Sequence, residues 1–150
     1  MSTSTSSSDL YDMVKIVESD GTIKIRKYCK KSGWLREEEI HRNGKLEGER
    51  KKWYANGQMS VLEFYVHGER RNRKTWHRNG KRNMEEHYLY DIFGMRIRRT
   101  RVYLDINENL QEQISFEGKE LVDRTFFLED GQTDQRFNFG RWHRKFRTLE

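Results

Sequence analysis

The chain has 150 residues and a formal net charge of +6, and 33% of its residues are hydrophobic, 36% charged and 13% aromatic. This length fits one domain. Taken alone, the low hydrophobic and high charged fractions favour disorder, whereas aromatic residues in alternation argue against it. A repeat sheet can fold with a thin core, because each hairpin buries its apolar face on its neighbours. No apolar run approaches the roughly 20 residues that cross a bilayer. The composition therefore predicts a soluble protein with a thin core.

Residues 1–9 are rich in serine and threonine and contain no apolar stretch. They lack the apolar centre of a secretory signal peptide and are predicted to form a disordered tail. Cys29 is the only cysteine, so a disulfide within the chain is excluded and a reducing compartment is expected. These features predict an intracellular protein of the cytoplasm.

One short helix is an alternative for residues 10–17. Leu10, Met13, Val14 and Val17 share one helical face, and the preceding Ser/Asp run could cap it. The remainder of the chain shows the alternation of β-strands, so the main expectation is an all-β protein with at most this one helix.

Two similar cassettes, WYANG at 53–57 and WHRNG at 76–80, lie 23 residues apart. A fixed period of this size indicates a repeat architecture. Weaker copies of the turn follow at 105–109 and 129–132. Two turns and two strands in each period correspond to a repeated β-hairpin. The spacing from Trp76 to its counterpart Tyr103 stretches to 27 residues, so the register is expected to slip near Tyr90–Gly94.

The dipeptide Asn56-Gly57 is typical of a two-residue type I′ hairpin turn, in which both central residues have φ > 0. Such a turn places Arg50 opposite Glu63 and Tyr54 opposite Met59. Opposite charges on facing strands contribute roughly 0.2–1 kcal/mol, which supports this register.

The second Asn-Gly dipeptide, at 79–80, predicts a matching hairpin. It places Lys74 opposite Glu85 and Arg73 opposite Glu86, again pairing unlike charges. Proline is absent from the chain, so nothing interrupts a continuous ladder. Turns are expected near 43–44, 56–57, 79–80, 106–108 and 130–131.

Residues 44–58, GKLEGERKKWYANGQ, resemble the consensus of the variant MORN repeat. Similar repeats occur in bacterial proteins described as antitoxin components and in some giant DNA viruses. The second copy departs from the pattern, because residues 67–71 are one residue short and lack the second glycine. The resemblance implies an elongated single-layer stack of antiparallel hairpins with a binding or scaffolding role and no catalytic site.

This organisation predicts a hairpin-repeat domain over 10–140 and a basic, aromatic C-terminal cap over 141–150. One set of residues is expected to form the repeat core and its turns. These are Gly44, Gly48, Trp53, Tyr54, Asn56, Gly57, Phe64, Asn79, Gly80, Tyr103, Phe127 and Gly131.

Charge is unevenly distributed. Residues 67–101 hold eleven Lys/Arg and four acids, for +7, whereas residues 102–134 hold two Lys/Arg and nine acids, for −7. The basic segment is either a docking surface for an acidic partner or the solvated face of a thin sheet. Its candidate interaction residues, with two from the C-terminal cap, are Arg70, Arg71, Arg73, Lys74, Trp76, Arg78, Arg96, Arg98, Arg99, Arg101, Trp142 and Arg144.

The sequence offers no glycine-rich phosphate loop, no paired Cys/His ligand spacing and no nucleophile elbow. It therefore predicts no enzyme activity, no cofactor and no metal. The expected function is a protein-interaction or scaffold module that binds a protein partner or itself, and a viral structural or assembly component if the source is a virus, with the virion or infected cell as its location. The alternative is a charge-driven binder of nucleic acid or anionic phospholipid through residues 67–101.

Overall fold

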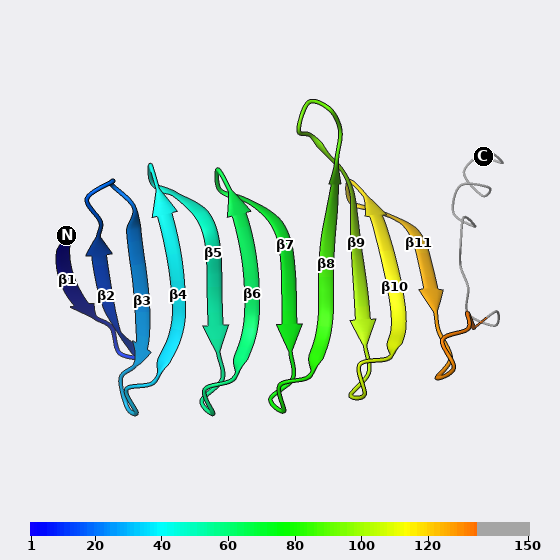
Figure 1. Ribbon diagram of the computed structural model, residues 1–150, viewed down its shortest axis with the longest axis horizontal. Helices are drawn as coiled ribbons and strands as arrows, with labels where there is room; N and C mark the ends of the chain where they lie inside the picture. The colour runs from blue at the N-terminus through cyan, green and yellow to red at the C-terminus, as the bar shows by residue number, and fades with distance from the viewer. Residues whose placement is uncertain (135–150) are drawn as a thin grey trace. The chain divides into compact units, whose positions relative to one another are not determined.

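The computed structural model describes residues 1–134, which form one antiparallel sheet with the strands in sequence order (Figure 1). No helix occurs in this range. The strands are β1 (Ser2–Ser7), β2 (Tyr11–Val17), β3 (Ile23–Cys29), β4 (Leu35–Arg42), β5 (Lys45–Trp53), β6 (Met59–Val66), β7 (Glu69–Trp76), β8 (Arg82–Tyr90), β9 (Arg96–Leu104), β10 (Leu110–Glu117) and β11 (Glu120–Phe126). The predicted all-β sheet of sequential hairpins is confirmed.

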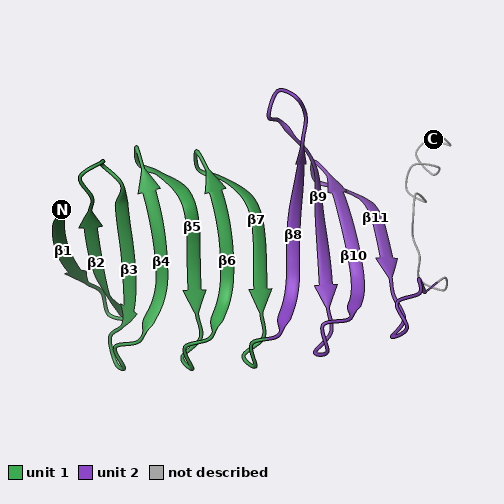
Figure 2. Ribbon diagram, viewed as in Figure 1, with its two compact units in different colours: residues 1–80 green, residues 81–150 purple. Residues whose placement is uncertain are grey.

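The chain divides into two compact units, residues 1–80 and residues 81–150 (Figure 2). The first unit contains β1 to β7, and the second contains β8 to β11. The predicted cap over 141–150, with Trp142 and Arg144, lies outside the described residues.

The predicted register between β5 and β6 is confirmed over most of its length, because Arg50 pairs with Glu63. It changes next to the turn, where Met59 faces Trp53 and not Tyr54. The cause is a five-residue loop, in which the Tyr54 N–H donates to the Gln58 carbonyl at 2.8 Å. The type I′ prediction at 56–57 is therefore wrong in its details, although the turn lies where it was predicted.

All five predicted turns are present. The type I′ geometry occurs at Asn43-Gly44, where φ is 51° and 74°. In the five-residue loop only Gly57 has a positive φ, of 82°, and the Asn56 side-chain oxygen accepts a hydrogen bond from the Gln58 N–H at 3.1 Å. In the loop at 54–58, the side chain of Asn56 therefore accepts a hydrogen bond in place of a backbone carbonyl. In the turn at 43–44, the backbone of Asn43 adopts the left-handed conformation.

The helix alternative for residues 10–17 is wrong, because Tyr11–Val17 form β2 between β1 and β3. The β-branched Val14, Ile16 and Val17 favour an extended chain, and two flanking strands satisfy its backbone. Residues Ser2–Ser7, expected to be a tail, form the fully exposed strand β1. The Ser7 hydroxyl donates to Asp12 Oδ1 at 2.7 Å across this pair.

The buried positions of the sheet are largely polar. Glu63, Tyr65, Met84 and Glu86 are all buried, and Glu86 is 0% exposed. Phe64, predicted to lie in the repeat core, is 40% exposed. Successive side chains on a strand point to opposite faces, so the burial of Glu63 and Tyr65 leaves Phe64 on the other face of β6. This core prediction is wrong.

Candidate functional site

Glu63 is the centre of a buried ionic cluster in the first unit. Its carboxylate lies 3.3 Å from Arg50 Nη1, 2.9 Å from Arg70 Nη1 and 3.5 Å from Arg73 Nε. The Tyr65 hydroxyl donates to the same carboxylate at 3.2 Å. A buried carboxylate is tolerated only when it is paired and hydrogen-bonded, and three arginines from β5 and β7 meet this need.

Glu86 repeats this arrangement in the second unit. The Tyr88 hydroxyl and Arg101 Nε both donate to its carboxylate, and Arg99 Nε lies 3.9 Å away. The hydrogen bond to Glu86 raises the pKa of Arg101 above its usual value, against the opposing effect of burial. This cluster is a structural element of the sheet, since its charges compensate one another.

The candidate residues of the basic segment are therefore mostly not free to receive an acidic partner. Six of them lie within 4 Å of a glutamate carboxylate, namely Arg70, Arg71, Arg73, Arg98, Arg99 and Arg101. Arg78 and Arg96, in contrast, form no ion pair within residues 1–134, and their guanidinium groups lie 5.8 Å from the Tyr54 centroid and 5.0 Å from the Tyr88 centroid. The backbone carbonyl of Trp76 accepts a hydrogen bond from the Tyr54 hydroxyl at 2.7 Å. Within each unit, most of these cations therefore lie against a carboxylate.

The loop between β8 and β9, residues 91–95, carries an exposed apolar cluster that the sequence interpretation did not select. Ile92 is 93% exposed, Phe93 84% and Met95 68%. Figure 1 shows this loop extending beyond the turn that joins β10 to β11. The four extra residues between Trp76 and Tyr103 are the signal that could have located it, because they lengthen this hairpin.

Asp91 fixes the conformation of this tip. Its Oδ1 accepts hydrogen bonds from the N–H groups of Phe93 and Met95 at 2.9 and 2.8 Å. The Asp91 N–H donates to the Met95 carbonyl at 2.9 Å, and Gly94 supplies a φ of 80°. These hydrogen bonds hold the loop backbone in a turn, and the exposed fractions of Ile92, Phe93 and Met95 show that their side chains face solvent.

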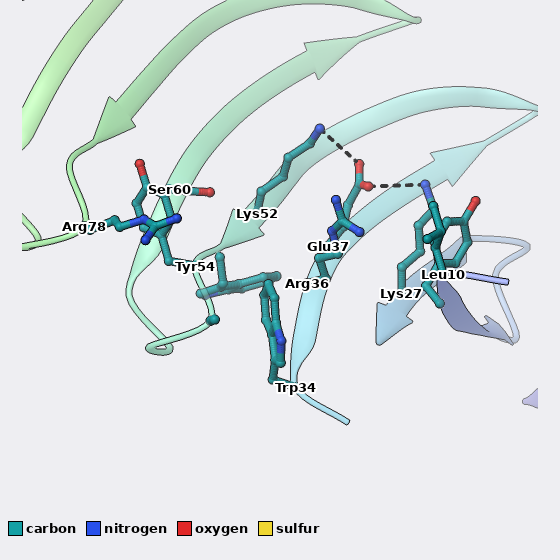
Figure 3. A pocket seen from close by; sticks show the side chains of 12 residues that line it. Leu10, Lys27, Trp34, Arg36, Glu37, Lys52, Tyr54, Ser60 and Arg78 are labelled. Atoms are coloured by element: carbon teal, nitrogen blue, oxygen red, sulfur yellow. Dashed lines mark hydrogen bonds and ion pairs between the residues drawn. The ribbon is translucent and has the colours of Figure 1, made fainter. Parts of the chain in front are cut away.

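The first unit also contains an open groove of about 540 Å³. Its walls combine aromatic rings with cationic groups, including Trp34, Tyr54, Lys27 and Arg78. Figure 3 shows Arg78 and Tyr54 at one end and Lys27 at the other, with Trp34 between them. Of these, only Tyr54 and Arg78 were selected from the sequence, and neither was assigned to a groove.

Residues 1–134 contain no cluster of three or more His, Cys, Asp or Glu side chains suited to a metal ion. In the same range, no helix could cross a lipid bilayer. The sequence predictions on enzyme activity and cofactors stay predictions.

No protein-family model matches the chain, and no curated protein matches it. Among solved structures, the chain is similar to S. aureus TarM, with a TM-score of 0.34 and 13% sequence identity. This likeness covers 81% of the present chain and 20% of the TarM chain, so the chain spans about a fifth of that protein. A likeness at this level says nothing about the activity of the chain.

Proposed function

We propose that this protein is a non-enzymatic interaction module of MORN-like hairpin repeats that docks a partner protein through the β8–β9 tip. The observation that carries the proposal is the exposed cluster of Ile92, Phe93 and Met95 on an ordered loop. Large contiguous apolar patches on a protein surface mark interaction sites. The resemblance of residues 44–58 to the MORN repeat supports the same role.

The chemistry of the tip suits a hydrophobic pocket on the partner. Aromatic residues and methionine are enriched in interfaces, and a few such anchors supply most of the binding energy. An anchor that is ordered before binding loses little conformational entropy when it docks. Arg96 and Arg98 lie at the base of the tip, where exposed charges chiefly affect the association rate and its salt dependence.

The test is affinity purification of the tagged full chain from its native source. The tip variant is Ile92→Ser with Phe93→Ser. The matched control is Ile106→Ser with Leu128→Ser, which removes two other exposed apolar side chains of the second unit. The proposal expects one set of partner proteins with the wild type and the control, and its loss with the tip variant. Equal retention by all three proteins would refute it.

Anionic phospholipid is the second candidate partner, because the same apolar tip stands beside the exposed cation Arg96. An apolar anchor next to cations is the arrangement that binds an anionic membrane surface. Sedimentation with vesicles of phosphatidylserine and phosphatidylcholine tests this alternative. If the wild type sediments with the vesicles, the tip variant does not, and no partner protein is found, the phospholipid candidate replaces the protein-docking proposal.

A further inference from the structure

The groove of the first unit is independent of the β8–β9 tip and has a different chemistry. Its volume of about 540 Å³ lies within the roughly 300–1,000 Å³ of small-molecule sites. The rings of Tyr11, Trp34 and Tyr54 contribute to its walls. These residues come from β2, from the loop before β4 and from the loop after β5, so three different hairpins build one site.

The cations that line the groove form two classes. Lys27 Nζ and Lys52 Nζ lie 3.3 and 3.9 Å from the Glu37 carboxylate, and Figure 3 shows both contacts. Arg36 and Arg78, in contrast, form no side-chain hydrogen bond or ion pair within residues 1–134. Both are exposed. Four cations against one carboxylate give the lining a formal charge of +3.

We propose that this groove binds a nucleotide unit, with its base against Trp34 and its phosphate on one of the two exposed arginines of the lining, Arg36 or Arg78. A guanidinium group matches phosphate oxygens with two parallel N–H donors. Aromatic side chains stack bases with little dependence on base identity. The Arg78 guanidinium lies 5.8 Å from the centroid of the Tyr54 ring, so this cation stands next to an aromatic wall of the groove.

The aromatic ring and the arginines of the groove together favour a nucleotide over an acidic peptide as the ligand. A peptide carboxylate can satisfy Arg36 or Arg78, but it leaves the exposed part of the Trp34 ring without a stacking partner. The nucleotide can be free or part of a single strand, and the chemistry is the same in both cases. The chain length of the probe distinguishes the two sources.

Intrinsic tryptophan fluorescence provides the assay. The full chain is titrated with thymidine monophosphate and, separately, with an oligothymidylate of about eight nucleotides, a length within the range of single-strand sites. Saturable binding of the monophosphate identifies a free-nucleotide site, and binding of the oligonucleotide alone identifies a single-strand site. For the oligonucleotide, log K should fall with log salt at a slope of about −0.7 for each phosphate contacted, or about −1.4 for two.

The variant Arg36→Gln with Arg78→Gln should weaken binding at least tenfold and flatten this salt dependence. The matched control, Lys15→Gln with Lys119→Gln, removes two positive charges outside the groove and should retain most of the affinity. Trp34→Ala should weaken binding by about tenfold, within the range of base-stacking losses, and Trp34→Phe should restore most of it. Circular dichroism verifies that each variant keeps its sheet.

Three results would overturn the proposal. The first is the absence of saturable binding of either probe by the wild type. The second is an equal loss in the groove variant and its lysine control, which shows that only net charge matters. The third is equal competition by polyglutamate, which shows that the groove accepts an acidic peptide and makes no use of its rings. The tip variant Ile92→Ser with Phe93→Ser should bind the oligonucleotide normally, so the two proposals fail separately.

Discussion

Glu63 and Glu86 lie 23 residues apart in the chain, and each is a buried carboxylate held by arginines and by the tyrosine two residues further on. The repeat period therefore reproduces a polar cluster as well as a turn. Each unit of the chain buries one copy.

Glu86→Gln should lower the free energy of unfolding by about 1–3 kcal/mol, because the buried position loses its charge-assisted hydrogen bonds while the partly exposed arginines keep contact with water. Denaturant unfolding measures the change. The control is Glu117→Gln, which breaks an ion pair with Arg98. The side chains of Arg98 and Glu117 are 47% and 37% exposed, so the loss should be less than about 1 kcal/mol. Similar losses in the two variants would contradict a structural role for the buried cluster.

Stability should fall as the pH drops below about 4.5, the usual pKa of a glutamate. Burial acts to raise the pKa of Glu37, but the hydrogen bond and charge of Arg50, with Lys52 and Lys27, outweigh it and lower this pKa. A carboxylate with a lowered pKa in the folded state stabilises the fold above its unfolded pKa. That stability is lost as the pH falls through the folded-state value.

The variant Glu37→Gln should therefore show a smaller loss of stability on acidification than the wild type. Thermal unfolding followed between pH 7 and pH 3 provides the comparison. The control Glu129→Gln removes one carboxylate from an exposed loop and should leave the acid dependence nearly unchanged. An unaltered pH profile in Glu37→Gln would assign the acid sensitivity to other groups.

Gly57→Ala should cost about 1–2 kcal/mol, the usual cost of a left-handed conformation for an L-residue. A Cβ at Gly57 would meet no atom within 4 Å, so the loss comes from the backbone and not from a clash. Gly57→Asn should cost less, because asparagine visits this conformation more readily. Equal unfolding midpoints for Gly57→Ala and the wild type would show that the loop adopts another conformation.

Ile92→Ser with Phe93→Ser should change the free energy of unfolding by less than about 0.5 kcal/mol, as surface substitutions do. Both side chains are almost fully exposed, so the folded sheet gains little from them. Chemical denaturation of the purified variant checks this prediction. A clearly lower midpoint would mean that the tip packs against the protein itself, which would remove the basis for its docking role.

Local features of the sequence were sufficient to predict the hairpins. The Asn-Gly turns and the unlike charges of Arg50 and Glu63 located a loop and set the register of β5 and β6. The helix proposed for 10–17 failed because apolar residues at helical spacing also occur in a strand of β-branched residues. The cross-strand partners that decide between the two come from distant parts of the chain.

The buried and functional positions were harder to predict. Apolar character predicts Phe64 in the core, whereas the fold buries Glu63 because arginines from two neighbouring strands surround it. The exposure of Ile92 and Phe93 depends on the lengthened β8–β9 hairpin, and a slip in the repeat period is its only signal in the sequence. The groove near Trp34 is lined by residues of three hairpins. These residues come together only when the strands pair in the sheet, so no local sequence pattern marks the groove.

The polar character of the buried positions has a thermodynamic consequence. The heat capacity change of unfolding reflects newly exposed apolar surface, reduced by exposed polar surface, and is commonly about 12–15 cal/mol/K per residue. A sheet whose buried positions are mostly polar, such as Glu63, Tyr65 and Glu86, exposes comparatively little apolar surface when it unfolds. The heat capacity change of unfolding of this protein should therefore lie below this range. A small heat capacity change makes the free energy of unfolding vary little with temperature, with a broad maximum. Differential scanning calorimetry should find a free energy of unfolding that changes little on cooling. The hydrophobic effect weakens at low temperature, and a fold that buries little apolar surface loses less stability from this weakening.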